Sequence, residues 1–106
     1  MTLADKKCIA CEGNVPQLPK TRAKQLVRQV DGWIMHGKVI EKGFVFQDFK
    51  TAKQFIDKVA VIAEQEGHHP DIIWVYNKIR LTLWTHAANG LTENDFIMAA
   101  KIDTIS

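Results

Sequence analysis

The chain has 106 residues, of which 46% are apolar, 8% aromatic and 25% charged, with a net charge of +2. This length suffices for one compact domain but not for two of ordinary size, and the composition is that of a globular protein rather than a disordered one. The longest apolar runs have five residues, whereas a membrane-spanning helix needs about 20. Since no basic and then apolar leader opens the chain, we expect a soluble, cytoplasmic protein without a membrane partner.

Residues 1–19 have weak periodicity, so we expect an amino-terminal arm ahead of a single domain at 20–106. The arm holds both cysteines, Cys8 and Cys11. A structural zinc site needs four ligands, and a redox-active Cys-x-x-Cys pair follows a buried strand. We therefore expect an incidental or packing role for the pair, with redox activity and metal binding as the alternatives.

Helical spacing begins after Pro19 and continues to about Val30, because the apolar residues recur on one face. The basic side chains of this helix have no aromatic residues between them. They therefore indicate a solvated face, and we expect no nucleic-acid partner. Gly32 ends the helix, since glycine readily takes the left-handed conformation at that position.

Two strands follow, at 33–35 and 39–46, with a turn at Gly37-Lys38. In the second strand Ile40, Phe44 and Phe46 share one face, which is typical of a half-buried antiparallel strand. Asp48 is then a good N-cap for a helix over 49–66.

Gly67 stops that helix, and a third strand at 72–76 turns back at Asn77-Lys78. The fourth strand alternates, with Ile79, Leu81 and Leu83 facing inward and Arg80, Thr82 and Trp84 facing outward. After a loop, Thr92 and Asp95 form a capping box for a last helix that ends near Asp103.

The predicted order is α-β-β-α-β-β-α. It indicates an α+β two-layer sandwich in which three helices cover one face of a four-stranded antiparallel sheet. Open sheet edges and an uncovered face favour self-association.

Three of the four histidines flank the second hairpin. His68 and His69 precede its first strand, and His86 follows its second. Because the two strands are antiparallel, entrance and exit lie at the same end. The sequence therefore predicts that the three imidazoles converge at one site.

Clustered imidazoles could bind zinc or transfer protons. Neighbouring His68 and His69 point to opposite sides of an extended chain, which disfavours a shared metal ion. Imidazole can donate or accept a proton near neutral pH, which favours general acid–base catalysis. The simplest alternative, that histidines only fill a polar loop, fits His36 better than the other three. Asp95 could cap its helix, orient an imidazole, or do both.

The spaced pattern of Glu64, His68-His69-Pro70, Tyr76, His86 and Asp95 resembles the signature of the pterin-4a-carbinolamine dehydratases. The stretch from Tyr76 through Thr85-His86 to Asp95 is similar to that family almost continuously. The resemblance covers residues 20–103.

The resemblance implies a dehydratase that converts a 4a-hydroxytetrahydropterin to a quinonoid dihydropterin, in support of tetrahydropterin recycling after aromatic amino acid hydroxylation. It implies that His68 and His86 are the acid and the base. It also implies that His69 is a catalytic residue, which binds and orients the pterin. It places Glu64, His69, Pro70, Thr85 and Asp95 among the substrate-binding residues. No metal or organic cofactor is implied. Because family members are typically dimers or tetramers, the resemblance also implies a homodimer or homotetramer.

The resemblance also leaves an alternative function. Some family members act as dimerisation cofactors for a homeodomain transcription factor, so a regulatory role as a partner-binding protein without catalysis is the second hypothesis. A metal-dependent hydrolase is a third, and we expect no bound zinc.

Overall fold

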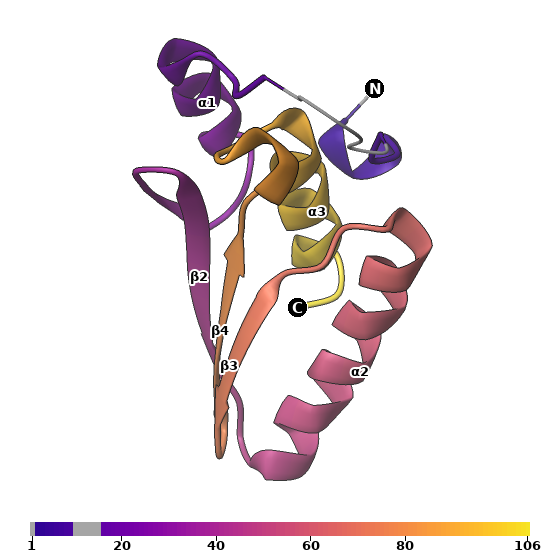
Figure 1. The fold of residues 1–106 in the computed structure, drawn as a ribbon. Helices are drawn as coiled ribbons and strands as arrows, with labels where there is room; N and C mark the ends of the chain where they lie inside the picture. Colours follow the sequence, from indigo (N-terminus) through magenta and orange to yellow (C-terminus); the bar gives the residue numbers. More distant parts are fainter. Residues whose placement is uncertain (1, 10–15) are drawn as a thin grey trace.

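A four-stranded antiparallel sheet and three α-helices form two layers (Figure 1). The computed structural model describes residues 2–9 and 16–106. The strands are β1 (Ile34–His36), β2 (Val39–Val45), β3 (Asp71–Val75) and β4 (Lys78–Leu83). The helices are α1 (Lys20–Val27), α2 (Phe49–Glu66) and α3 (Glu93–Asp103), and the 3-10 turns are η1 (Leu3–Asp5) and η2 (His86–Ala88). The predicted α+β class and the order of helices and strands are confirmed.

The two hairpins join through β2 and β4, which leaves β1 and β3 as the edges of the sheet. Ile40 pairs with Leu83, and Phe44 pairs with Ile79, all from the inward-facing positions of β2 and β4. Figure 1 shows the sheet nearly edge-on, with α2 and α3 on the same side of it. The alternation predicted for both strands is therefore confirmed.

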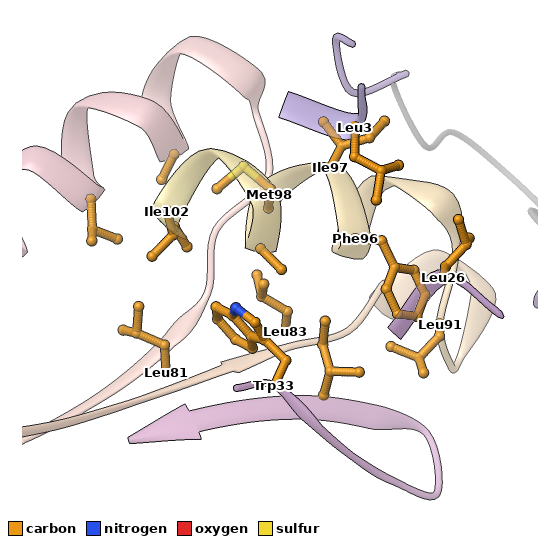
Figure 2. Packing of buried hydrophobic residues seen from close by; sticks show 14 of the residues in the cluster. Leu3, Leu26, Trp33, Leu81, Leu83, Leu91, Phe96, Ile97, Met98 and Ile102 are labelled. Atoms are coloured by element: carbon orange, nitrogen blue, oxygen red, sulfur yellow. The ribbon is translucent and has the colours of Figure 1, made fainter. Parts of the chain in front are cut away.

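Helix α3 supplies the centre of the core (Figure 2). Phe96, Met98 and Ile102 have no exposed surface. Met98 and Ile102 lie above Leu81 and Leu83 of β4, and Phe96 lies beside Leu26 and Leu91. Burying one such side chain contributes roughly 1.5–3 kcal/mol to the stability of the fold. The helix that bears Asp95 is thus held firmly on the sheet.

Helix α2 begins and ends at the predicted residues. The Thr51 N–H donates to Oδ1 of Asp48 at 2.8 Å, which caps the first turn. At the other end Gly67 has φ of 63°, a left-handed conformation that glycine adopts without steric cost, and its N–H donates to the Ala63 carbonyl. This turn redirects the chain toward β3 at His68.

The amino-terminal residues pack against the domain, which the sequence did not predict. Leu3, in the 3-10 turn η1, is buried against α3 (Figure 2). The Cys8 N–H donates to Oε1 of Glu66 at 2.9 Å, and the half-buried Cys8 thiol lies 3.6 Å from the Asn94 carbonyl oxygen. Cys11, the second member of the predicted pair, lies outside the described residues.

Several boundaries differ from the sequence prediction. Strands β1 and β3 are shifted by one residue and β2 is one residue shorter, whereas the end of α1 and the second hairpin turn differ for a clear physical reason. Helix α1 ends at Val27 because the N–H groups of Gln29 and Val30 bond to carbonyls three residues back, in a tightened last turn. The turn between β3 and β4 is Tyr76-Asn77, since Lys78 is already paired with both neighbouring strands.

Among the described residues, no helix combines the length and the apolar character that crossing a bilayer requires.

Candidate active site

A cavity of about 360 Å³ lies where the chain enters and leaves the second hairpin. It is lined by Gly67, His68, His69, Pro70, Asp71, Trp84, Thr85, His86 and Ala87. The two lining segments come from the start of β3 and the end of β4. The predicted convergence of the three imidazoles therefore occurs, because the antiparallel hairpin brings its two ends together.

His68 is held by a carboxylate from α3. Its Nε2 lies 2.6 Å from Oδ1 of Asp95, and the His68 side chain is only 11% exposed. An ionised carboxylate can only accept, so Nε2 carries the proton in this contact. That assignment leaves Nδ1 as the nitrogen available for proton exchange when the ring is neutral.

The Asp95 carboxylate is fully buried, and both of its oxygens have hydrogen-bond partners. Its Oδ2 accepts from the Thr92 N–H and from the Thr85 hydroxyl, both at 2.9 Å. The contact with Thr92 belongs to the predicted capping box, which is present. Asp95 therefore caps α3 and orients His68 at once, and its carboxylate lies behind the cavity rather than on its surface.

His69 has an exposed partner. Its Nε2 lies 2.6 Å from Oε2 of Glu64, and the two side chains are 60% and 79% exposed. Glu64 comes from the last turns of α2 and does not line the cavity. Water screens this pair, so it contributes little to folding and instead restricts the His69 ring at the mouth of the cavity.

His86 opens the 3-10 turn η2, directly after Thr85. A bridge between Thr85 and Gly90 closes this turn, with the Thr85 N–H donating to the Gly90 carbonyl at 2.9 Å. Asn89 ends the turn in a left-handed conformation, with φ of 51°. His86 is exposed, and its ring lies against the Trp84 ring at a centroid distance of 3.9 Å.

The other predicted substrate-binding residues, Pro70 and Thr85, differ in how deeply they are buried in the cavity wall. Pro70 lines the cavity and is half-buried. Thr85 also lines it, but its hydroxyl donates to Asp95 and lies 2.7 Å from the Thr92 hydroxyl. Because Thr85 donates its proton to Asp95, Thr92 is the donor in the second contact. The Thr85 hydroxyl therefore stabilises the carboxylate that holds His68.

Four lining residues were not among the predicted site residues: Gly67, Asp71, Trp84 and Ala87. Trp84 and Asp71 line the cavity, and the Trp84 indole Nε1–H donates to Oδ2 of Asp71 at 3.3 Å. The alternation in β4 predicts that Trp84 faces outward, but only the register with β3 brings Asp71 beside it. In the sequence, the position of Trp84 directly before Thr85-His86 was the one signal that could have assigned Trp84 to the site.

The arrangement is suited to moving protons. One imidazole is oriented by a buried carboxylate, and a second lines the same cavity from an exposed turn. Such a pair can give a proton to one atom of a bound molecule and take one from another. In residues 2–9 and 16–106, no three His, Cys, Asp or Glu side chains are grouped so that they could hold a metal ion.

Comparisons with known proteins point to one family. Residues 16–105 match the sequence profile described as pterin 4 alpha carbinolamine dehydratase. A Nitrosospira multiformis protein, provisionally named pterin-4-alpha-carbinolamine dehydratase, is 50% identical over 97% of this chain and 91% of its own length. One from Aromatoleum aromaticum, with the same provisional name, is 43% identical over 98% of this chain and 95% of its own. A crystal structure of a transcriptional coactivator/pterin dehydratase from Brucella melitensis aligns with a TM-score of 0.79 and 37% identity, over 84% of this chain and 97% of that one.

Proposed function

This chain belongs to the pterin 4 alpha carbinolamine dehydratase family, and on that premise we propose that it removes water from a 4a-hydroxytetrahydropterin to give a quinonoid dihydropterin. The observation that carries the proposal is the placement of His68, His69 and His86 around one cavity. A cavity of about 360 Å³ is within the size range of pockets that bind small molecules.

The reaction needs two proton transfers. The ring nitrogen next to carbon 4a loses its proton, and its electrons form the carbon–nitrogen double bond. The bond between carbon 4a and the hydroxyl oxygen breaks, and that oxygen leaves as water after it receives a proton. Hydroxide is a poor leaving group, so an acid must act at the oxygen while a base acts at the nitrogen. The reaction as written requires no metal or organic cofactor.

We assign the acid and base roles to the pair His68 and His86. The buried Asp95 carboxylate supports the role of His68, because it fixes the ring and stabilises the positive charge that the ring gains with a second proton. His69, restrained by Glu64, is assigned to binding and orienting the pterin at the mouth. Pro70 forms part of the cavity wall. Thr85 and Asp95 contribute through their hydrogen bonds to each other and to His68.

We place the reaction in the recycling of tetrahydropterins after aromatic amino acid hydroxylation, in the cytoplasm.

We also propose a homodimer or homotetramer. In the part of the chain that the structure describes, β1 and β3 are the edge strands of the sheet, and pairing with a second copy would cover such an edge.

A role in binding a partner protein is the second candidate, with the cavity unused. The sheet face opposite the helices favours it, because that face exposes Ile34, Val45, Ile73 and Val75. Exposed apolar surface of this kind is typical of protein interaction sites. The relative from Brucella melitensis also carries a coactivator description.

One experiment separates the two candidates. A pterin-dependent hydroxylase generates the carbinolamine, and its absorbance is followed with and without this protein. We expect the carbinolamine to decay faster in proportion to the amount of protein added. A folded protein that leaves the decay rate unchanged would exclude the dehydratase and favour the partner-binding role.

A further inference from the structure

Trp84 is the one large aromatic side chain that lines the cavity with the three histidines. Its ring lies against His86, with centroids 3.9 Å apart and planes tilted by 31°. Its indole Nε1–H donates to Oδ2 of Asp71 at 3.3 Å. The indole is thus fixed at one end by the first residue of β3 and contacts the imidazole with its ring.

The position of Trp84 is not explained by the hydrophobic core. It follows Leu83, whose side chain is fully buried on the inward face, and it is itself half-buried on the other side. Trp84 is not part of the core cluster, and its indole contacts Asp71 and His86. The side chain therefore stabilises the mouth of the cavity rather than the packing of the two layers.

His86 needs such a contact more than His68 does. Asp95 holds the His68 ring from a buried position. His86 is exposed on a three-residue 3-10 turn, and its ring lies against the Trp84 indole, a contact that can restrain its rotamer. A general acid or base contributes fully only when it is held in reach of the reacting atom.

We propose that Trp84 is a positioning residue, which Asp71 anchors and which holds the His86 imidazole in its reactive orientation. This inference rests on the proposed dehydratase function. It adds an Asp71–Trp84–His86 arrangement to the cavity that the Asp95–His68 contact also borders. Each of the two imidazoles then has its own orienting partner.

The test compares Trp84→Leu, which removes the aromatic ring, with Trp84→Phe, which keeps one. Trp74→Phe is the matched control, because Trp74 is also half-buried on this hairpin but donates to the Tyr76 carbonyl oxygen and stacks on Phe49. The first readout is the NMR signal of the His86 ring protons, identified by its loss in His86→Ala. A ring stacked on an indole has upfield-shifted signals, and this readout does not depend on activity.

We expect Trp84→Leu to abolish the upfield shift and to lower kcat by about tenfold with little change in KM, because misplacing a catalytic group slows the chemical step more than it weakens binding. Trp84→Phe should retain part of the shift and most of kcat. Asp71→Ala, which removes the anchor, should change both readouts in the direction of Trp84→Leu. Trp74→Phe should change neither.

The assignment is overturned if wild-type protein is active and Trp84→Leu keeps its kcat. It is also overturned if Trp84→Leu raises only KM while the His86 signal stays unchanged, because Trp84 would then contact the substrate instead. Loss of kcat without recovery in Trp84→Phe, together with an unchanged His86 signal, would likewise overturn it. A wild-type protein without dehydratase activity would overturn the proposed function itself, which is a different result from any of these.

Discussion

His68 and Asp95 lie 27 residues apart in the chain, and their side chains meet at 2.6 Å. His68 follows the left-handed Gly67 that ends α2, and Asp95 stands in the first turn of α3. The site is therefore built where one helix ends and another begins, on elements that the core holds in place. A carboxylate near a helix amino terminus is also stabilised by the helix dipole, so Asp95 suits the fold as well as the chemistry.

The variant Asp95→Asn should separate these two roles. The amide oxygen that replaces the carboxylate can still accept from the Thr92 N–H, so we expect the midpoint of thermal unfolding to change little. The amide NH2 that then faces His68 donates a hydrogen bond instead of accepting one, which favours the opposite ring tautomer, so we expect kcat to fall by at least about tenfold. Kinetics and thermal unfolding of the same sample measure both.

Asp95→Ala is the contrasting variant. It leaves the Thr92 N–H and the Thr85 hydroxyl without their buried acceptor, which costs about 1–3 kcal/mol. We expect it to lower stability as well as turnover. If Asp95→Asn is fully active, orientation of His68 by the carboxylate is not part of the mechanism.

Replacing His86 by Ala should affect activity alone. The side chain is exposed and is not among the core residues, so we expect thermal stability within about 0.5 kcal/mol of wild type. Turnover should fall by at least about tenfold, because one of the two proton-transfer groups is lost. Unaltered turnover in the carbinolamine assay would remove His86 from the mechanism.

The parts of the fold that local sequence determines were predictable. Asp48 and Gly67 mark the ends of α2 because each has a chemical reason to stop a helix there. Alternation in β4 placed Ile79, Leu81 and Leu83 in the core, where the structure has them. The meeting of three imidazoles followed from antiparallel strand geometry alone.

Contacts that depend on tertiary packing were not predictable. Leu3 forms part of η1 only because α3 offers it an apolar surface. The contact of Trp84 with Asp71 and His86 depends on the β3–β4 register together with the 3-10 turn after Thr85. Alternation predicts that Trp84 is on the outward face, but alternation does not predict which residues the turn places next to Trp84.

Glu64→Gln should have a small effect. The pair that Glu64 forms with His69 is largely exposed, and such pairs contribute about 0–1 kcal/mol. We expect unchanged stability, a kcat within about twofold of wild type, and a modest rise in KM, because the variant loosens only the binding group at the mouth. A loss of kcat as large as in Asp95→Asn would mean that Glu64 takes part in proton transfer.

Asp48 makes the stability of α2 depend on pH. The backbone N–H of Thr51, and then its side chain, donate to the carboxylate and hold the pKa of Asp48 below its ordinary value of 3.8. A carboxyl group whose pKa is lower in the folded state stabilises the fold at pH above 3.8, and this contribution is lost as the pH falls through the folded-state pKa. Between about pH 5 and about pH 2, we expect the unfolding midpoint of Asp48→Asn to fall less steeply than that of wild type. Since Asp5 also has a lowered pKa through Thr2, some slope should remain; parallel curves would show that the cap does not depend on charge.

Gly90 and Gln17 should be coupled energetically in the loop that carries His86. A Cβ at Gly90 would lie 2.6 Å from Cδ of Gln17, whose Nε2 donates to the Asn89 carbonyl at 2.9 Å. Gly90→Ala must therefore push the Gln17 side chain away and break that hydrogen bond, and we expect a loss of about 1–2 kcal/mol. In a Gln17→Ala background the clash is absent, so the same change should cost less by about 0.5 kcal/mol or more. Urea unfolding of wild type, the two single variants and the double variant gives the coupling energy. Strictly additive effects would show that Gln17 does not stabilise this loop.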